Sequence, residues 1–489
     1  MLRNPLVGAE GMSVRIAVIG GSVAGLAAGI LLARQGHEVL IFDGDDIRPT
    51  RDIETAARNA WRPGAPHAPH GHGLLSLGRR VLLTRLPDVR EGLLANGAVE
   101  LPMIMPSTIA DHSERADDEL RPIATRRSTF EWVFRTVASR EPGITLHGGD
   151  KVTGLVTNSD TLIHVRGVEV EGRGPVPADM VVDAGGRRSP VPGWLVAVGA
   201  RSPGIRFGEC ALLYYTRHFR LRPGASAPPR SATQAGVSIV TTLPFGNVLL
   251  FVSDNGTVQL SMAVHADDHP MKVLRHEAAY DAFTRLIPAL EPWLKVLEPI
   301  SDVWVMSAPR NVLRRDVVDG TPVALRLLAI GDAVSNTNPS FGRGMSLALC
   351  QAAMLADVVA AHPRDAFAQA LMLDERIDHD VAPWFEDQVA FDTFRVASVR
   401  ATVFGTPPPQ PVFLAHEFTL PQVFAAVVTN AVVWRAWMRR QHMLDNASKM
   451  FADPVVLGLI RGTTVPSTQA PNVPTRDEVL RAIGDAVTA

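Results

Sequence analysis

The chain has 489 residues, of which 46% are apolar and 20% charged, and its formal net charge at neutral pH is −2. This length predicts two or three domains, and the near-neutral charge argues against nucleic acid as a partner. The two cysteines lie far apart, which excludes a disulfide framework and suits a reducing compartment. Because we find neither a signal-peptide pattern nor an uncharged run of 18 apolar residues, we expect a cytoplasmic protein without a membrane span.

The first 43 residues contain a β-α-β pattern. Residues 16–19 form a short apolar run typical of a strand buried on both faces, and residues 39–42 form a second. Between them, residues 24–35 have a helical pattern that stops at Gly36. The segment Gly-Gly-Ser-Val-Ala-Gly at 20–25 joins strand to helix without a polar linker. This order predicts a parallel sheet with a phosphate-binding turn at the start of the helix.

The glycine-rich turn has the features of a dinucleotide site. The first glycine permits a tight turn, the last lets the helix approach the strand, and a serine replaces the usual middle glycine. Asp43, about 20 residues after the glycines, is placed to bind ribose hydroxyls, and its carboxylate argues against a 2′-phosphate. We predict that the dinucleotide contacts Gly20, Ser22, Val23, Ala24, Gly25 and Asp43.

Residues 62–73 form a loop rich in proline and glycine, and a helical pattern follows at 74–86. The loop contains His67, His70 and His72, but no carboxylate or cysteine lies among them, so we expect no metal here. We expect instead that the loop lies against the cofactor. Arg62 and the histidine side chains would then donate hydrogen bonds to it.

Two more apolar strands are predicted, each with an aspartate at or just after its end and glycine close by. Residues 178–183 end at Asp183, before Ala-Gly-Gly, and residues 323–330 precede Gly-Asp, which contains Asp332. Ligands in open α/β sheets bind at the carboxyl ends of strands, so both aspartates are candidate site residues. Pro-Ser-Phe-Gly-Arg-Gly-Met at 339–345 then leads into a predicted helix over 346–361. Its first N–H groups suit an anionic ring or oxygen.

The segment 206–304 differs in character from the rest of the chain. Alternating stretches at 210–221, 237–243, 247–253 and 257–264 predict an antiparallel sheet, with a helix around 276–290 covering it. We interpret this sheet as the wall of a substrate domain. Beyond residue 363 the chain is mostly helical, with a proline break at 407–411 and a capping box at 475–478. A helix over 423–440 with a basic end is compatible with a membrane surface, but a core helix is the commoner case.

Three motifs in this order resemble the FAD-dependent monooxygenase superfamily that includes p-hydroxybenzoate hydroxylase. They are the turn at 20–25, VVDAGGRRS at 181–189 and GDAVSNTNPSFGRGMS at 331–346. Finer details at 62–75, 127–132 and 183–195 resemble bacterial polyether-type polyene epoxidases. The resemblance implies an α/β fold: a Rossmann-like FAD-binding domain (13–95, 120–195 and 305–365), an interleaved antiparallel-sheet substrate domain (96–119 and 196–304) and a C-terminal helical region (366–489).

The resemblance also implies roles for single residues. Arg127, which opens a predicted helix running to about residue 140, would hold the phosphate or ribityl region, and Asp332 would bond a ribityl hydroxyl. Asp183 would also lie at the cofactor. The flavin pyrimidine edge would face the last helix start, at Gly342, Gly344 and Met345, whose dipole would stabilise reduced flavin.

The function implied is that of a FAD-dependent monooxygenase. It would transfer one oxygen atom from O2 to a largely apolar, natural-product-type substrate through a flavin C4a-hydroperoxide. We find no convincing general base, which favours epoxidation over hydroxylation. The superfamily hydroxylases usually have Asp-Gly where this chain has Asp183-Ala184, so NAD(P)H and a separate flavin reductase both stay open as electron sources.

The sequence also bears on three other functions. The chain has no Trp-x-Trp-x-Ile-Pro stretch, which argues against halogenation. The Asp-Ala-Gly-Gly form keeps open a flavin-dependent reductase or dehydrogenase of an isoprenoid-like double bond. A non-catalytic flavin-binding subunit is the third alternative, but an intact glycine-rich helix start at 342–345 argues against it.

Overall fold

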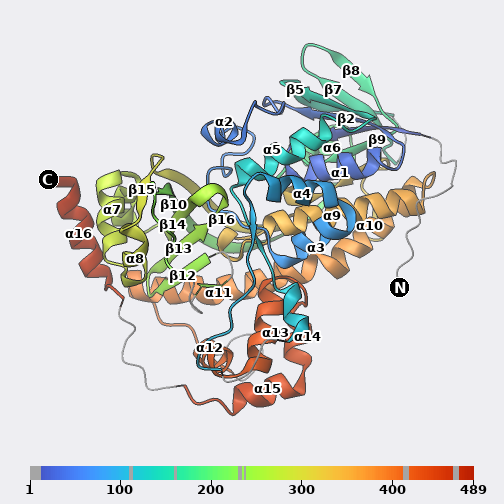
Figure 1. Ribbon diagram of the computed structural model, residues 1–489. Coiled ribbons are helices and arrows are strands. Elements are labelled where there is room, and N and C mark those ends of the chain that lie inside the picture. The colour runs from blue at the N-terminus through green and yellow to red at the C-terminus, as the bar shows by residue number, and fades with distance from the viewer. Residues whose placement is uncertain are drawn as a thin grey trace.

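The computed structural model describes residues 13–109, 114–158, 162–229, 234–235, 238–410, 418–465 and 473–488. Figure 1 shows a parallel sheet surrounded by helices, a large antiparallel sheet beside it, and a group of C-terminal helices below both. The predicted mixed α/β architecture is therefore confirmed.

The parallel sheet has five strands in the order β19-β9-β1-β2-β5. They are β19 (Leu327–Ala329), β9 (Met180–Asp183), β1 (Arg15–Ile19), β2 (Glu38–Asp43) and β5 (Ile144–Gly148). The apolar pattern predicted a longer β19, over 323–330, and this is wrong because Arg326 has a φ of +62° and interrupts the extended chain. Because all neighbours are parallel, the motifs that follow β1, β9 and β19 meet at one edge of the sheet.

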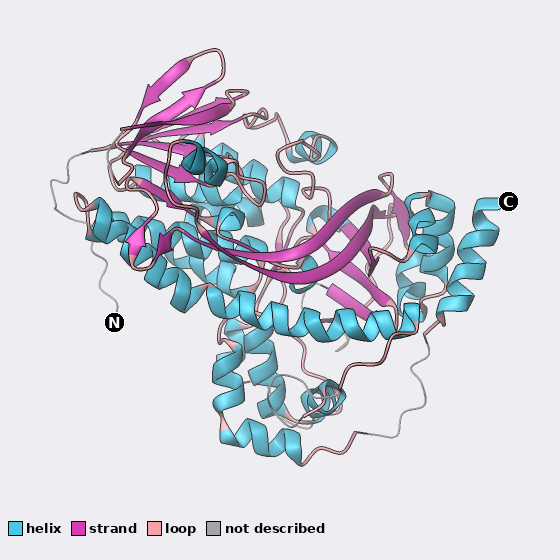
Figure 2. Cartoon of the chain, turned by 180° about the vertical axis from the view of Figure 1, so that it is seen from behind, coloured by secondary structure: helices cyan, strands magenta, loops and turns pink. Residues whose placement is uncertain are grey.

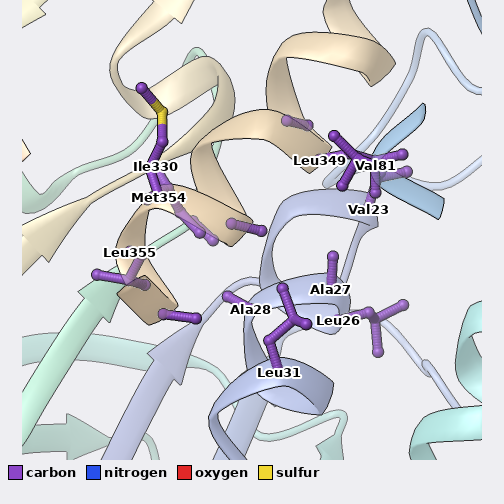
Figure 3. Close-up of a cluster of buried hydrophobic side chains, with 14 of the residues drawn as sticks. Val23, Leu26, Ala27, Ala28, Leu31, Val81, Ile330, Leu349, Met354 and Leu355 are labelled. Carbon is purple, nitrogen blue, oxygen red and sulfur yellow. The ribbon is translucent and has the colours of Figure 1, made fainter. Parts of the chain in front are cut away.

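Two apolar helices pack against each other over this sheet. Helix α1 (Val23–Ala33) and helix α9 (Gly344–Ala361) are apolar on most sides, as expected of helices without a solvent face. Figure 3 shows Leu26, Ala27 and Leu31 of α1 with Leu349 and Leu355 of α9 in one cluster. Helix α9 is long and apolar enough to cross a membrane, but 67% of it is buried inside the protein. It is therefore a core helix.

Further elements complete the first part of the chain. Helix α2 lies in the connection between β2 and the loop at 62–73. The bounds are α2 (Ile53–Arg58), α3 (Ser76–Arg85), α4 (Pro87–Ala95), β3 (Val99–Glu100), β4 (Ile123–Ala124), α5 (Arg127–Ala138), β6 (Val152–Thr157), β7 (Val165–Val170), β8 (Gly174–Pro177) and α6 (Val191–Ala197).

The antiparallel sheet has eight strands and confirms the β-rich segment. Its long central strands cross the molecule as two curved ribbons in Figure 2. The predicted covering helix is present as α7 (Glu277–Arg285), and the last helix, α16 (Arg476–Thr488), packs beside it on the same face. The strands are β10 (Gly204–Leu221), β11 (Gln234–Ala235), β12 (Ser238–Leu243), β13 (Gly246–Val252), β14 (Thr257–His265), β15 (Leu297–Pro299), β16 (Trp304–Arg315) and β20 (Ser335–Asn336); Val237 lies outside the described residues.

The C-terminal helices connect to two earlier segments. Helix α11 (Ala382–Phe404) runs along the antiparallel sheet and leads to a compact group of helices (Figure 1). Ile109, in the segment 96–119 expected in the substrate domain, and Leu120, just beyond it, pack on this group. Arg435 Nε also lies 3.1 Å from Asp117 Oδ1. The remaining helices are α10 (Ala366–Asp380), α12 (Leu420–Thr429), α13 (Ala431–Gln441), α14 (Ala447–Ala452) and α15 (Pro454–Arg461). The division into domains stays a prediction.

Helix α1 approaches β1 so closely that Gly25 cannot carry a side chain, and the same holds for Gly20 in the turn between them. A Cβ at Gly25 would lie 1.9 Å from the carbonyl oxygen of Gly20, and a Cβ at Gly20 would lie 2.4 Å from that of Ala184. Both contacts are to backbone atoms, which cannot rotate away. The turn is thus held between α1 and the segment after β9.

We expect Gly25→Ala to lower the free energy of unfolding by at least about 2 kcal/mol, because the methyl group must displace backbone. Gly458→Ala in α15 is the matched control, since a Cβ there meets no described atom within 4 Å. It should leave stability unchanged or raise it by up to about 1 kcal/mol, the difference in helix propensity. Urea unfolding of both variants measures this; equal effects would contradict the packing argument.

Candidate functional site

The start of α1 lacks the usual side-chain cap within the described chain. Its N-cap residue, Ser22, donates its hydroxyl to Glu131 Oε1 at 2.7 Å and accepts a hydrogen bond from Arg127 Nη2 at 2.9 Å. Asp43 Oδ2 accepts the N–H of Gly21 at 2.8 Å. The first N–H groups of the helix itself are therefore left for a ligand, and the helix dipole favours an anionic one.

Three arginines surround a buried carboxylate next to this helix start. Glu131 is 4% exposed; Arg62 Nη2 lies 2.7 Å from its Oε2, Arg127 Nε 3.0 Å from its Oε1, and Arg135 Nη2 3.0 Å from its Oε2. Burial raises the pKa of Glu131, but the charges of these arginines outweigh burial and hold it well below its usual range. Such a concentration of guanidinium groups suits a phosphate ligand.

The sequence reasoning included Arg62 and Arg127 but missed Glu131 and Arg135. The signal was available, because Arg127, Glu131 and Arg135 are spaced four residues apart along α5 and so share one face of that helix. What the spacing could not show is that this face is buried against the glycine-rich turn.

The loop 62–73 connects the arginine cluster to the antiparallel sheet. His72 Nδ1 donates to the carbonyl of His70 at 2.7 Å, and its Nε2 lies 3.4 Å from Arg127 Nη1. His70 Nδ1 lies 2.8 Å from Thr216 Oγ1 on β10. Burial lowers the pKa of both His70 and His72 to about 3, so both are neutral in the folded protein. In the described chain, no three His, Cys, Asp or Glu residues are grouped as metal ligands.

The turn that contains Asp332 lies against the start of α1. A Cβ at Gly331 would lie 2.7 Å from the Cβ of Ala24, so the two motifs are in direct contact. Asp332 Oδ2 accepts a hydrogen bond from Asn336 Nδ2 at 3.0 Å. Burial raises the pKa of Asp332, and the positive charge of Arg127 opposes this, which places that arginine within electrostatic reach. The structure thus places the turn that contains Asp332 beside Ala24, two residues after Ser22, to which Arg127 bonds.

The third motif ends in a helix start with space beside it. Gly342 has a φ of +66°, and α9 begins at Gly344, where a Cβ would meet no described atom within 4 Å. The side chain of Met345 is 3% exposed and belongs to the core around α1. Only its backbone N–H can face a ligand.

Asp183 is bonded within its own turn. Its carboxylate accepts the hydroxyl of Ser189 at 2.7 Å and the N–H of Gly185 at 2.9 Å, and the residue is 1% exposed. Burial raises its pKa. This arrangement shapes the segment on which Gly20 packs, and the direct cofactor contact expected of Asp183 stays a prediction.

Comparisons with known proteins agree with this geometry. No protein-family model matches the chain. The Mycobacterium tuberculosis protein Rv3254 is 25% identical over 468 residues, covering 90% of this chain and 91% of that protein. The flavin-dependent brominase Bmp2 superposes with a TM-score of 0.62 at 15% identity, covering 92% of this chain and 98% of its own.

PqsL from Pseudomonas aeruginosa, in complex with 2-aminobenzoylacetate, superposes with a TM-score of 0.57 at 18% identity, covering 81% of this chain and all of its own. PqsL is described as a probable FAD-dependent monooxygenase. The chain has the fold of flavin-dependent monooxygenases and halogenases. At these identities the likeness concerns the fold, so the ligand and reaction must be argued from the site.

The buried neutral histidines predict a pH-dependent stability. His70 is 3% exposed with a pKa of about 3, whereas an unfolded histidine titrates near 6.5, so the unfolded chain takes up a proton first as pH falls. Stability from His70 is complete above about pH 6.5 and is lost towards about pH 3; between about pH 7 and about pH 5.5 the loss is about 1 kcal/mol.

His70→Gln should reduce this pH sensitivity by that amount in urea unfolding, compared with the unchanged protein. His379→Gln is the control, because the His379 side chain is 86% exposed, and it should leave the pH sensitivity as it was. Equal slopes for all three proteins would show that His70 is not held neutral.

Proposed function

We propose that this protein is a FAD-dependent monooxygenase. The observation that carries the proposal is the contact between Ala24, at the start of α1, and Gly331, in the turn that leads towards the start of α9. An elongated ligand with anionic groups at two places, a pyrophosphate and a reduced ring, suits a site that contains the start of α1 and, further along, the start of α9. FAD has both groups.

The residues present fit this cofactor. The turn at 20–25 would hold the pyrophosphate, with Arg62 and Arg127 supplying positive charge, and Asp43 would bind the adenosine ribose. Asp332 would bond the ribityl chain, and the N–H groups at 342–345 would face the flavin ring. The space beside Gly344 and the uncapped start of α1 support both ends of this placement.

The antiparallel sheet offers an apolar wall for the substrate. Leu212, Tyr214, Leu249 and Ala263 form a buried cluster on the face opposite α7, with Met306 partly buried at its edge. The hydroxyl of Tyr214 donates to Asn338 Oδ1 at 2.7 Å, which joins this wall to the segment before α9. A largely apolar substrate would therefore lie between the sheet and the flavin-binding segment.

Bound FAD, once reduced, would supply the reaction of O2 that delivers one oxygen atom to the substrate. The protein's own groups bind, orient and exclude water. Among the described residues of this face we find no effective general base: burial lowers the pKa of His70 to about 3 and raises that of Tyr214 well above its ordinary value. We therefore propose epoxidation of an alkene rather than hydroxylation that depends on deprotonating a phenol.

Two electron sources remain part of the proposal, bound NAD(P)H and a separate flavin reductase. NAD(P)H oxidation by the purified protein distinguishes them, because it requires that the protein itself bind NAD(P)H. Halogenation is not proposed, since the Trp-x-Trp-x-Ile-Pro stretch is absent from the whole sequence.

The test begins with the absorption spectrum of the purified protein after addition of FAD. A flavin spectrum that stays with the protein through gel filtration supports the cofactor, and its absence contradicts the proposal. The loaded protein is then reduced without oxygen and mixed with aerated buffer. A transient near-ultraviolet band before the blue band returns supports a monooxygenase; direct return of the blue band, with candidate alkenes present, would favour the reductase alternative.

Arg127→Met should raise the dissociation constant for FAD at least about tenfold, because charge-assisted bonds of a buried arginine to phosphate are lost. Glu131 keeps Arg62 and Arg135 as partners, so the variant should fold. The control is Arg140→Met, at the exposed end of the same helix segment, which should bind FAD as before. Fluorescence titration of apoprotein with FAD measures both; equal affinities would remove Arg127 from the site.

A further inference from the structure

Two buried arginines share a single carboxylate next to the start of α9. Arg343 is the N-cap residue of α9 and Arg440 lies on α13; both are 0% exposed. Arg440 Nη2 lies 2.6 Å from Asp387 Oδ1, and Arg343 Nη2 bonds to Asp387 Oδ2. Asp387 is 4% exposed and comes from α11. The cluster therefore joins the flavin-binding segment to two C-terminal helices.

This cluster carries a net charge of about +1, since guanidinium groups stay protonated in proteins. Arg343 Nη1 finds a further neutral acceptor, the carbonyl of Trp384 at 3.1 Å, and Arg343 Nε has no hydrogen-bond partner within the described chain. The rings of Phe341 and Trp384 flank the Arg343 guanidinium at 4.7 and 5.1 Å. Aromatic faces stabilise the cation without cancelling its charge.

The next carboxylate along α11 does not compensate this charge. Asp392 is held by Arg395 Nε at 3.0 Å, Asn338 Nδ2 at 2.7 Å and Asn311 Nδ2 at 2.8 Å. It already has its own arginine. Burial lowers the pKa of Arg343 and the charge of Asp387 opposes this; Arg440 lowers the pKa further, and Asp392 adds a smaller opposing charge.

We propose that Arg343, Asp387 and Arg440 together place an uncompensated positive charge at the start of α9, which stabilises the anionic form of a ring bound there. The inference rests on the proposed flavin site. It gives the C-terminal helices a role in that site, because Asp387 and Arg440 both come from them. These residues do not touch the ring; their positive charge adds to the partial positive charge of the helix N-terminus.

Sulfite titration of the FAD-loaded protein tests the charge directly. The sulfur of sulfite donates its lone pair to oxidised flavin and leaves negative charge on the pyrimidine side, which bleaches the blue absorption band. Arg440→Met removes one positive charge, so we expect sulfite to bind about tenfold more weakly. Asp387→Asn removes the negative charge, so we expect sulfite to bind about tenfold more tightly.

The two substitutions should change sulfite affinity in opposite directions, which distinguishes an electrostatic effect from a structural one. If the cluster only held the fold together, both substitutions would loosen the site and shift sulfite binding in the same direction, and this would overturn the inference. Asp387→Asn leaves two buried cations and could fail to fold. The double variant Arg440→Met, Asp387→Asn then decides, because its net charge equals that of the unchanged protein and it should restore the original sulfite affinity.

A matched control lies one residue away on the same helix. Arg439 is 26% exposed at its side chain and pairs with Asp445 and with Glu119, the latter at 3.0 Å, rather than with Asp387. Arg439→Met should leave sulfite binding unchanged. If FAD binds to every variant but Arg440→Met has unchanged sulfite affinity, the inference is wrong and the proposed function stands; if FAD binds to none, including the unchanged protein, the proposed function fails.

Discussion

Helices α1 and α9 pack against each other in one core over the parallel sheet, and this packing brings together the turns that follow β1 and β19. Gly20 and Gly25 let α1 approach β1 to within backbone contact, and Gly331 brings the turn after β19 against Ala24. The positive end of α1 lies at this edge of the sheet, where its first N–H groups favour an anionic ligand.

The arginines around Glu131 show how the protein keeps such a site stable before a ligand arrives. Without a carboxylate, three buried guanidinium groups would be uncompensated at large cost. Glu131 bonds to all three and accepts the hydroxyl of Ser22, and Asp43 and Asp45 lie 3.7 and 3.6 Å from Arg62. These carboxylates offset part of the positive charge and hold the arginines beside the helix start. Preorganisation of this kind lowers the entropy cost of ordering side chains when a ligand binds.

The C-terminal helices are built into the site at its opposite end. Asp387 and Asp392 of α11 reach Arg343 and Asn338, the residues on either side of the segment that leads into α9. The buried tryptophans of α13 and the buried Arg440 also show that this helix faces the protein interior. The sequence made the basic end of this helix compatible with a membrane surface, but Arg440 at that end forms a buried ion pair with Asp387.

The sequence by itself determined the β-α-β unit, the order of the three glycine motifs and the antiparallel sheet, because each depends on local periodicity and on residues with special backbone freedom. Asp43, Arg127 and Asp332 could be chosen because they stand at fixed places beside such motifs. The shorter β19 could not be foreseen, since the positive φ of Arg326 leaves no mark in an apolar run.

Only the tertiary structure decided which charged side chains share a partner. Glu131 and Arg135 lie on a regular helix face that reads like a solvated one, and Asp387 and Arg440 lie 44 and 97 residues beyond Arg343. Buried ion pairs form between groups distant in sequence because desolvation forces each charge to find a partner wherever the packed elements bring one. That choice depends on how elements distant along the chain pack together, which no local pattern records.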